Sequence, residues 1–123
     1  MALHLDLGRK GESLAKTFLE AAGYEILDEN WTHGKAEIDL VAYKNSVIIF
    51  TEVKTRSGNA FGEPEDFVDA RKQKLLVEAA DEYIYLMDHK GDVRFDIISI
   101  LFDRKANYTL KHIEDAFWPS SPI

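Results

Sequence analysis

The sequence lacks cysteine and any long apolar run, and these two absences narrow the class of protein. None of the 123 residues is cysteine, so disulfides and cysteine-ligated zinc are excluded, and an intracellular location is the expectation. The amino-terminal residues contain no long apolar stretch after a basic start, and no later stretch approaches the length of a membrane span. We therefore expect a cytoplasmic protein without membrane contact.

The patterns of several enzyme classes are also missing. The sequence contains neither a glycine-rich phosphate-binding loop nor the signature of a nucleophile triad. The four histidines include no pair at metal-ligand spacing. We find no internal repeat, linker or low-complexity tract, so the length predicts a single domain over residues 1–123. The proline-broken segment 118–123 is expected to be a mobile tail.

The net charge of −7 argues against a protein that coats nucleic acid through bulk electrostatics, because phosphate binding depends on lysine and arginine. The cations are nevertheless unevenly distributed. Acidic residues concentrate in segments 63–69 and 78–82. Five cations gather in the middle third of the chain, namely Lys54, Arg56, Arg71, Lys72 and Lys74. The sequence is therefore compatible with a basic groove on an acidic body.

Hydrophobic periodicity predicts an α/β domain with the element order αβββαββ. Apolar residues at helical spacing predict helices over residues 8–22 and 66–87. Two helices can cover both faces of one mixed sheet. Runs of β-prone residues predict strands over 24–27, 93–102 and 108–113, and a hairpin over 36–56 with a polar tip at Lys44-Asn45-Ser46. Residues 30–35 are predicted to form a polar turn before the hairpin.

Two carboxylates and a lysine lie within this hairpin in strongly apolar surroundings. They belong to an E-I-D run that ends at Asp39 and an E-V-K run from Glu52 to Lys54. We expect position 39 to pair with 50, which puts Asp39, Glu52 and Lys54 on one face, with the first two roughly 7 Å apart at the backbone. The alternative is an ordinary strand ion pair between Glu52 and Lys54 beside a solvated strand start.

A carboxylate pair at that separation suits a shared divalent cation. Hard oxygen ligands hold Mg²⁺ or Mn²⁺, which polarise a phosphate and help to make hydroxide from bound water. A lysine two residues beyond a liganding carboxylate can orient the attacking water or offset charge on the phosphoryl oxygens. The motif therefore predicts metal-assisted phosphodiester hydrolysis by Asp39, Glu52 and Lys54.

Each predicted helix adds one charged residue beside its apolar stripe. Glu12 lies about 20° from Leu19 around the helix axis, so its carboxylate faces inward. It is either a first-turn acid that interacts with the helix dipole or a third carboxylate of the site. Lys72 falls in line between Val68 and Leu76, and it is either a snorkelling lysine or a phosphate contact beside the site.

These motifs in this order resemble the YraN-type family of small bacterial proteins, within the restriction-endonuclease-like PD-(D/E)xK nuclease superfamily. Archaeal-type Holliday-junction resolvases are similar in size and motif order. The resemblance implies an α/β/α sandwich with a mixed five-stranded sheet. It covers nearly the whole chain, through residues 8–15, 23–27, 30–31, 37–40, 52–56, 61–62, Val68 with Lys72 and Leu76, 94–96 and 113–117.

The resemblance also implies the roles of the site residues. Asp39 and Glu52 bind Mg²⁺ or Mn²⁺, Lys54 is the catalytic lysine, and Glu12 completes the acidic cluster. Lys72 matches a basic position on the second helix of the family.

The expected activity is that of a metal-dependent endonuclease on DNA, acting on branched or recombination intermediates by analogy with resolvases. The charge distribution further predicts that Arg56, Arg71, Lys72 and Lys74 lie on the side of the site and contact the nucleic acid. Because resolvases act as dimers, a homodimer is a further expectation. The alternative is a non-catalytic nucleic-acid-binding or partner-binding protein that retains the nuclease fold.

Overall fold

The computed structural model describes residues 3–58, 68–105 and 107–117, with side chains from residue 7 onward. The tail expected at 118–123 and most of the loop after the E-V-K strand lie outside the described residues. The predicted order αβββαββ and the mixed five-stranded sheet are confirmed. The elements are α1 (Leu3–Ala21), β1 (Glu25–His33), β2 (Ala36–Lys44), β3 (Val47–Ser57), α2 (Ala70–Leu86), β4 (Val93–Phe102) and β5 (Tyr108–Ile113).

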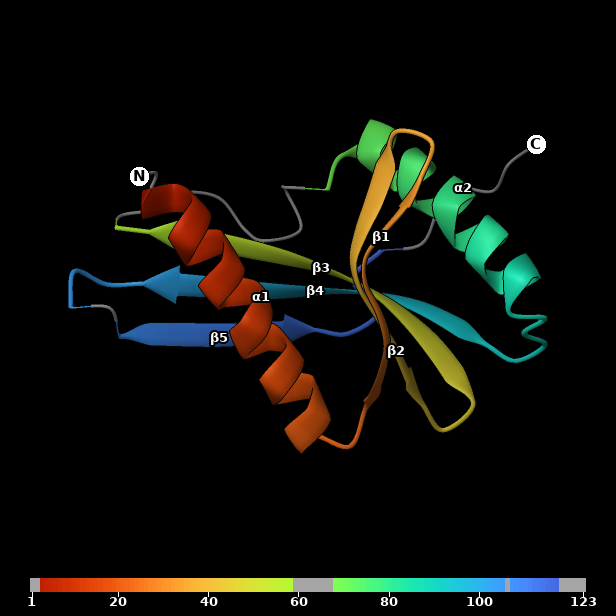
Figure 1. The fold of residues 1–123 in the computed structure, drawn as a ribbon, viewed down its shortest axis with the longest axis horizontal. Helices are drawn as coiled ribbons and strands as arrows, with labels where there is room; N and C mark the ends of the chain where they lie inside the picture. Colours follow the sequence, from red (N-terminus) through yellow and green to blue (C-terminus); the bar gives the residue numbers. More distant parts are fainter. Residues whose placement is uncertain (1–2, 59–67, 106, 118–123) are drawn as a thin grey trace.

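The strands lie in the spatial order β1-β2-β3-β4-β5, and β3 and β4 run parallel while the other neighbours are antiparallel. A parallel pair needs a long crossover, which the segment containing α2 provides. Figure 1 shows that β1 and β2 cross steeply over the direction of β3, β4 and β5, so the sheet is strongly twisted. This twist separates β2 from β3 toward one end of the hairpin.

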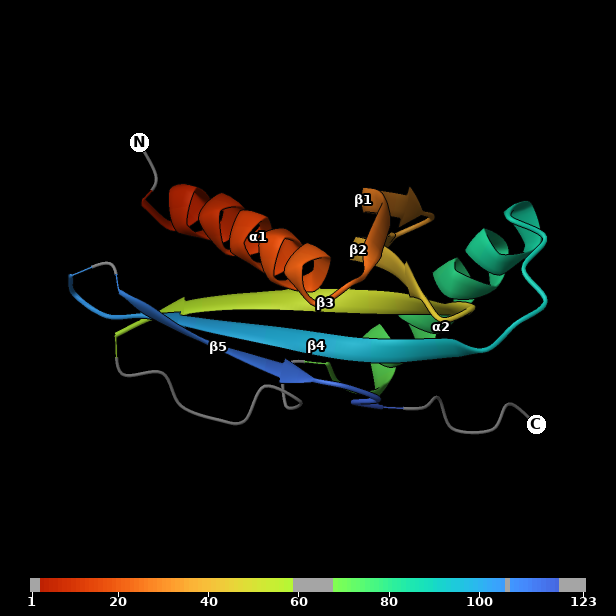
Figure 2. The same cartoon turned by 90° about the horizontal axis from the view of Figure 1, so that it is seen from below.

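The two helices cover opposite faces of the sheet. Along β3, Ile48 and Phe50 belong to the hydrophobic cluster beneath α2, whereas Ile49 belongs to the cluster beneath α1. Because side chains alternate along a strand, the two clusters lie on opposite faces. Figure 1 shows α1 in front of β3 to β5, with β1 passing in front of α2, and Figure 2 shows α1 lying along one face of β3 and β4. The predicted α/β/α arrangement is confirmed. In the described part of the chain, no helix is long and apolar enough to cross a membrane.

Strand β1 differs most from its prediction. The sequence predicted a strand over 24–27 and a polar turn from Asn30, whereas β1 continues to His33. Pairing with β2 through Trp31↔Ile38 supplies the ladder hydrogen bonds that hold this polar segment extended, and such pairing is invisible to local composition. The helix predicted from residue 66 begins at Ala70, where the Asp69 side chain accepts the N–H of Lys72 as an N-cap.

Helix α1 approaches β3 closely at Gly11, which is buried. A Cβ atom on Gly11 would collide with the Oγ1 atom of Thr55, whereas a Cβ on Gly8 would meet nothing within 4 Å. The missing side chain at Gly11 therefore sets the distance between the helix and the strand that carries the E-V-K run. Because Glu12 follows directly, the same contact helps to position its carboxylate.

Gly11→Ala is expected to lower the free energy of unfolding by about 2 kcal/mol, because overpacking outweighs the gain in helix propensity. Gly8→Ala, the matched control, is expected to be neutral or to stabilise by up to about 1 kcal/mol. Adding Thr55→Ala to Gly11→Ala should recover part of the loss, since it removes the colliding oxygen. Urea unfolding measures all four proteins, and equal effects of the two glycine substitutions would contradict the proposed close contact.

Candidate active site

The candidate site lies where β2 and β3 separate. The ladder between these strands ends at Leu40↔Thr51. Beyond it, the Asp39 N–H donates to Glu52 Oε2 at 3.4 Å, and the Val53 N–H donates to Asp39 Oδ2 at 2.8 Å. Each carboxylate thus accepts a backbone N–H that the separating strands no longer pair. This exchange brings the two carboxyl groups together, as the sequence predicted.

The predicted register of the hairpin was wrong by two residues. Position 39 was expected to pair with Phe50, but the partner of Phe50 is Val41. The pair Lys44↔Val47 leaves a two-residue loop, Asn45-Ser46, in which both φ angles are positive, 53° and 68°, as in the tight turns that suit hairpins. A shift of two residues preserves side-chain alternation. It therefore moves Asp39 nearer to Glu52 without turning it to the other face.

The Asp39–Glu52 pair is withdrawn from water, and this perturbs both carboxyl groups. Glu52 is 7% exposed, and Asp39 is half-buried. Burial and then the charge of Asp39 raise the pKa of Glu52 to about 8. Burial also raises the pKa of Asp39 to about 6, against the effect of the Val53 N–H and with help from the charge of Glu12. The pair therefore retains a proton near neutral pH, because two adjacent buried carboxylates repel each other, and a divalent cation that displaces this proton would relieve the same repulsion.

Lys72 is the cation that the described residues bring against this pair. Its Nζ lies 3.3 Å from Glu52 Oε1, and its side chain is 49% exposed. The charge of Lys72 lowers the pKa of both carboxyl groups and so opposes part of the rise. The lysine therefore reaches the site instead of only covering apolar surface. Its predicted contact with a phosphate stays a prediction.

Glu12 lies beside the pair. Helix α1 begins at Leu3, so Glu12 is well inside the helix and the first-turn interpretation is wrong. Its Oε1 accepts a hydrogen bond of 3.1 Å from Asn30, a residue with a left-handed φ of 51°. Across residues 3–58, 68–105 and 107–117, no three acidic or histidine side chains converge closely enough to hold a metal ion. Glu12 thus acts on Asp39 electrostatically, and the three-carboxylate metal set stays a prediction.

The remaining predicted cations occupy two elements. Lys54 is exposed and Arg56 is half-buried on β3, on the face that carries Glu52, and Arg56 donates to Ser99 Oγ at 3.4 Å. Arg71 and Lys74 are exposed on α2, before and after Lys72. Their role in nucleic-acid binding stays a prediction.

Two residues of this region, Asn30 and Lys111, were not predicted from the sequence. Asn30 was assigned to a turn, yet it orients Glu12 from within β1. Lys111 on β5 pairs with Ser99 on β4, which in turn pairs with Lys54 on β3, so the three side chains share one face. Only the register of β5 brings Lys111 near Lys54. Asparagine is enriched in the left-handed region, so the identity of residue 30 was a signal available in the sequence.

A second buried acidic group lies on the other face of the sheet. We call Arg94, Asp96 and His112 the Asp96 network. Asp96 is fully buried and accepts hydrogen bonds from Arg94 Nε and the Asp115 N–H at 2.8 and 3.0 Å, and it lies 2.7 Å from His112 Nε2. Every side of this carboxylate is occupied, so a hydrolytic role is not supported. Arg94 and Asp96 form an ion pair, with Nε 2.8 Å from Oδ1.

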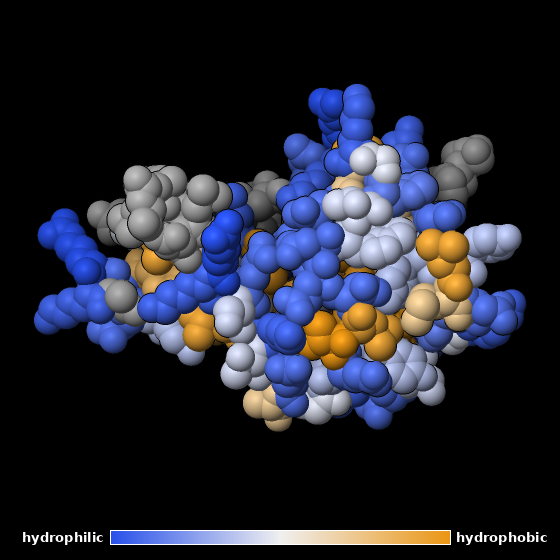
Figure 3. All heavy atoms as spheres, viewed as in Figure 1, coloured by the Kyte–Doolittle hydropathy of each residue, from blue (hydrophilic) through white to orange (hydrophobic). Residues whose placement is uncertain are grey.

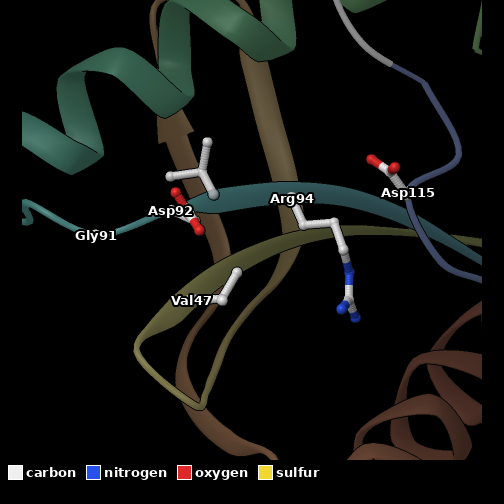
Figure 4. A pocket seen from close by; sticks show the side chains of 6 residues that line it. Val47, Gly91, Asp92, Arg94 and Asp115 are labelled. Atoms are coloured by element: carbon white, nitrogen blue, oxygen red, sulfur yellow. The ribbon is translucent and has the colours of Figure 1, made fainter.

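A pocket of about 540 Å³ lies beside this network and away from the Asp39–Glu52 pair. In Figure 4, Arg94 extends from β4 toward α1, away from α2. The pocket is open, and its lining mixes acidic, basic and apolar residues that do not form a recognisable binding or catalytic site. The described residues that line it are Val47, Gly91, Asp92, Val93, Arg94 and Asp115.

Comparison with known proteins identifies the family. The model of "Uncharacterised protein family UPF0102" matches residues 11–100. A UPF0102 protein of Flavobacterium psychrophilum is 48% identical over 118 residues, which cover 96% of this chain and 98% of the relative. A UPF0102 protein of Bacteroides thetaiotaomicron is 44% identical over 119 residues, covering 97% and 98%. One of Chlorobium chlorochromatii is 41% identical over 118 residues, covering 92% of each chain. The chain therefore belongs to the UPF0102 family, which is the YraN family that its motifs resemble.

Proposed function

We propose that this protein is a metal-dependent endonuclease that hydrolyses phosphodiester bonds in DNA. The observation that carries the proposal is the Asp39–Glu52 pair, two carboxyl groups held together in a buried seam with their pKa values raised to about 6 and about 8. Burying two acids side by side costs stability, and such costs concentrate at functional sites. Lys72, which lies beside Glu52, and the exposed Lys54 would supply positive charge for a phosphate substrate.

The donor set fits Mg²⁺ or Mn²⁺, because both ions prefer carboxylate oxygen. Asp39 and Glu52 would hold the ion, which when bound lowers the pKa of water and stabilises negative charge on a phosphate. Lys54 would orient the attacking water or offset charge on the phosphoryl oxygens. Lys72 would contact the phosphate from α2, and Glu12 would contribute negative charge beside Asp39.

The substrates that the resemblance favours are branched or recombination intermediates. Symmetric cleavage of a four-way junction requires two sites, and the expected homodimer would supply them.

A non-catalytic nucleic-acid-binding or partner-binding protein is the second candidate. The net charge of −7 favours it, since a nuclease must bring a polyanion to its site. The described residues also favour it, because no three of their acidic or histidine side chains lie close enough together to hold a metal ion. The two candidates differ in one measurable property, which is turnover.

The test is a nuclease assay on linear, flapped and four-way DNA with Mg²⁺ or Mn²⁺. Lys54→Ala is expected to lower the single-turnover cleavage rate by on the order of 10²-fold, with little change in DNA affinity, because it removes an interaction made in the transition state. Asp39→Asn, purified in parallel, guards against a contaminating nuclease. Cleavage by Lys54→Ala at the wild-type rate would reduce this lysine to a structural residue, and absence of cleavage by the wild type on every substrate would favour the second candidate.

A further inference from the structure

Positive charge is concentrated at one end of this acidic protein. We call this the basic end, and it consists of described segments 7–11, 55–58, 101–105 and 107–111. These segments carry one acidic residue, Asp103, whose carboxylate accepts the backbone N–H groups of Lys105 and Asn107. They carry six cations, Arg9, Lys10, Arg56, Arg104, Lys105 and Lys111, in a chain with a net charge of −7. The basic end is therefore opposite in sign to the molecule as a whole.

Contacts between elements show that the four segments meet. Lys10 Nζ lies 5.6 Å from the centroid of the Phe102 ring, which joins α1 to the end of β4. The Gly58 N–H donates to the Phe102 carbonyl at 3.2 Å, which joins the end of β3 to the same residue. The pair Phe102↔Tyr108 adds β5. Figure 1 shows the start of α1, the end of β3 and the β4–β5 turn at the same end, and Figure 3 shows long, strongly hydrophilic side chains projecting there.

The basic end is continuous with the candidate active site along β3. Glu52 is followed on the same strand face by Lys54 and Arg56, and four residues of strand span about 13 Å. Because B-DNA places a phosphate of one strand about every 3.4 Å along its axis, this path is about as long as four nucleotides. Lys111 widens the path on β5, next to Ser99 and Arg56.

We infer that the basic end binds the phosphate backbone of a DNA duplex and that the substrate enters the site from this side. The inference rests on the proposed function and adds to it the direction of the bound DNA. It also explains how a protein of net charge −7 can bind a polyanion, because local positive charge and not the total steers the encounter. The regularly spaced phosphates of a duplex can be contacted by six cations that are spread over four segments.

An anionic membrane is a less suitable partner for this end. Stable binding to a membrane surface requires apolar side chains beside the cations. The strongly exposed apolar residues Leu86 and Met87 lie at the carboxyl end of α2, which Figure 1 places at the opposite end of the molecule. Tyr108 is the large apolar residue exposed at the basic end, and its phenol ring can equally lie against a sugar or a base.

The test measures binding of a fluorescein-labelled 20-bp DNA duplex by anisotropy at several salt concentrations, using the full chain with Asp39→Asn to prevent cleavage. Arg104→Glu with Lys105→Glu is expected to weaken binding at least tenfold and to reduce the salt slope by about two units, because each lost phosphate contact removes about 0.9 unit. Lys90→Glu is the charge-matched control for Lys105→Glu alone, because both change the net charge by −2 and Lys90 is an exposed lysine paired with Asp88 in the turn after α2. It is expected to change affinity less than twofold.

Two further measurements separate this inference from the proposed function. Equal losses in Lys105→Glu and in Lys90→Glu would show that only net charge matters and would overturn the inference, as would binding to phosphatidylserine vesicles in preference to the duplex. Duplex binding that depends on Arg104 and Lys105 in a protein that never cleaves DNA would support the basic end and refute the nuclease. Cleavage by the wild type, together with an unchanged salt slope in Arg104→Glu with Lys105→Glu, would support the nuclease and refute the role of the basic end. Thermal melting of each variant verifies that it is folded.

Discussion

Asp39→Asn combined with Glu52→Gln is expected to raise the melting temperature at pH 8 in the presence of a chelator while abolishing DNA cleavage. The wild-type site buries two acids that repel each other, with pKa values raised to about 6 and about 8. Neutral amides of similar shape remove the repulsion and most of the desolvation cost. A protein that becomes more stable when its site is neutralised is one whose site is maintained for function.

The pH dependence follows from the sign of these shifts. The ordinary pKa of Glu52 is 4.5, and the folded protein raises it to about 8. Between these values the folded state binds more protons than the unfolded state, so the stability of the wild type falls as pH rises through this window. One extra proton bound in the folded state lowers the free energy of unfolding by up to about 1.4 kcal/mol for each unit of rising pH. The double variant is therefore expected to have a free energy of unfolding higher than that of the wild type by on the order of 3 kcal/mol at pH 8. Near pH 4.5 the gain should vanish.

Urea unfolding at pH 4.5, 6 and 8 measures this difference directly. Glu25→Gln is the control, because Glu25 is an exposed carboxylate of the neighbouring strand β1, and it should change stability little at any of these pH values. Millimolar Mn²⁺ is expected to stabilise the wild type and not the double variant. A double variant that is less stable than the wild type at pH 8, or equal metal responses, would refute the strained metal-binding pair.

Asp96→Asn is expected to lower the free energy of unfolding by about 3 kcal/mol at pH 7, because the half-buried guanidinium of Arg94 loses its fully buried anion and keeps only the exposed Glu114, 3.2 Å from its Nη1. Arg94 donates to both oxygens of Asp96 at 2.8 Å, and His112 and the Asp115 N–H approach the same carboxylate. The network also joins distant parts of the chain, since Arg94 donates to the Tyr24 hydroxyl at 2.8 Å. For a domain of this size the loss corresponds to a melting temperature lower by roughly 10 °C.

The pH dependence of this variant has the opposite sign. Burial alone would raise the pKa of Asp96, but the hydrogen bonds from His112 and Arg94, together with the Asp115 N–H, outweigh it and lower the pKa below its ordinary value of 3.8. The stabilisation is therefore complete above that value and is lost as pH falls through the lower, folded one. Wild type and Asp96→Asn should converge in acid. Asp92→Asn, an exposed acid on the same segment, should melt like the wild type, and an Asp96→Asn protein within 2 °C of it would contradict the structural role of the network.

The sequence alone determined the features that depend on local periodicity. Alternation along β3 placed Glu52, Lys54 and Arg56 on one face, and helical spacing placed Lys72 toward the sheet, where its Nζ meets Glu52. The position of β4 was predicted at residues 93–102 and is confirmed. These inferences hold because the side-chain periods of strands and helices are properties of the backbone itself.

Only the tertiary structure decided how separate elements meet. It corrected the register that puts Asp39 beside Glu52, placed Asn30 against Glu12, and gathered the start of α1, the end of β3 and the β4–β5 turn at one end. A turn of two residues with positive φ fixed the first, and the pairing and twist of the strands fixed the others. These quantities depend on residues far apart in the chain, and a local pattern carries no information about which distant strand will complete its hydrogen bonds.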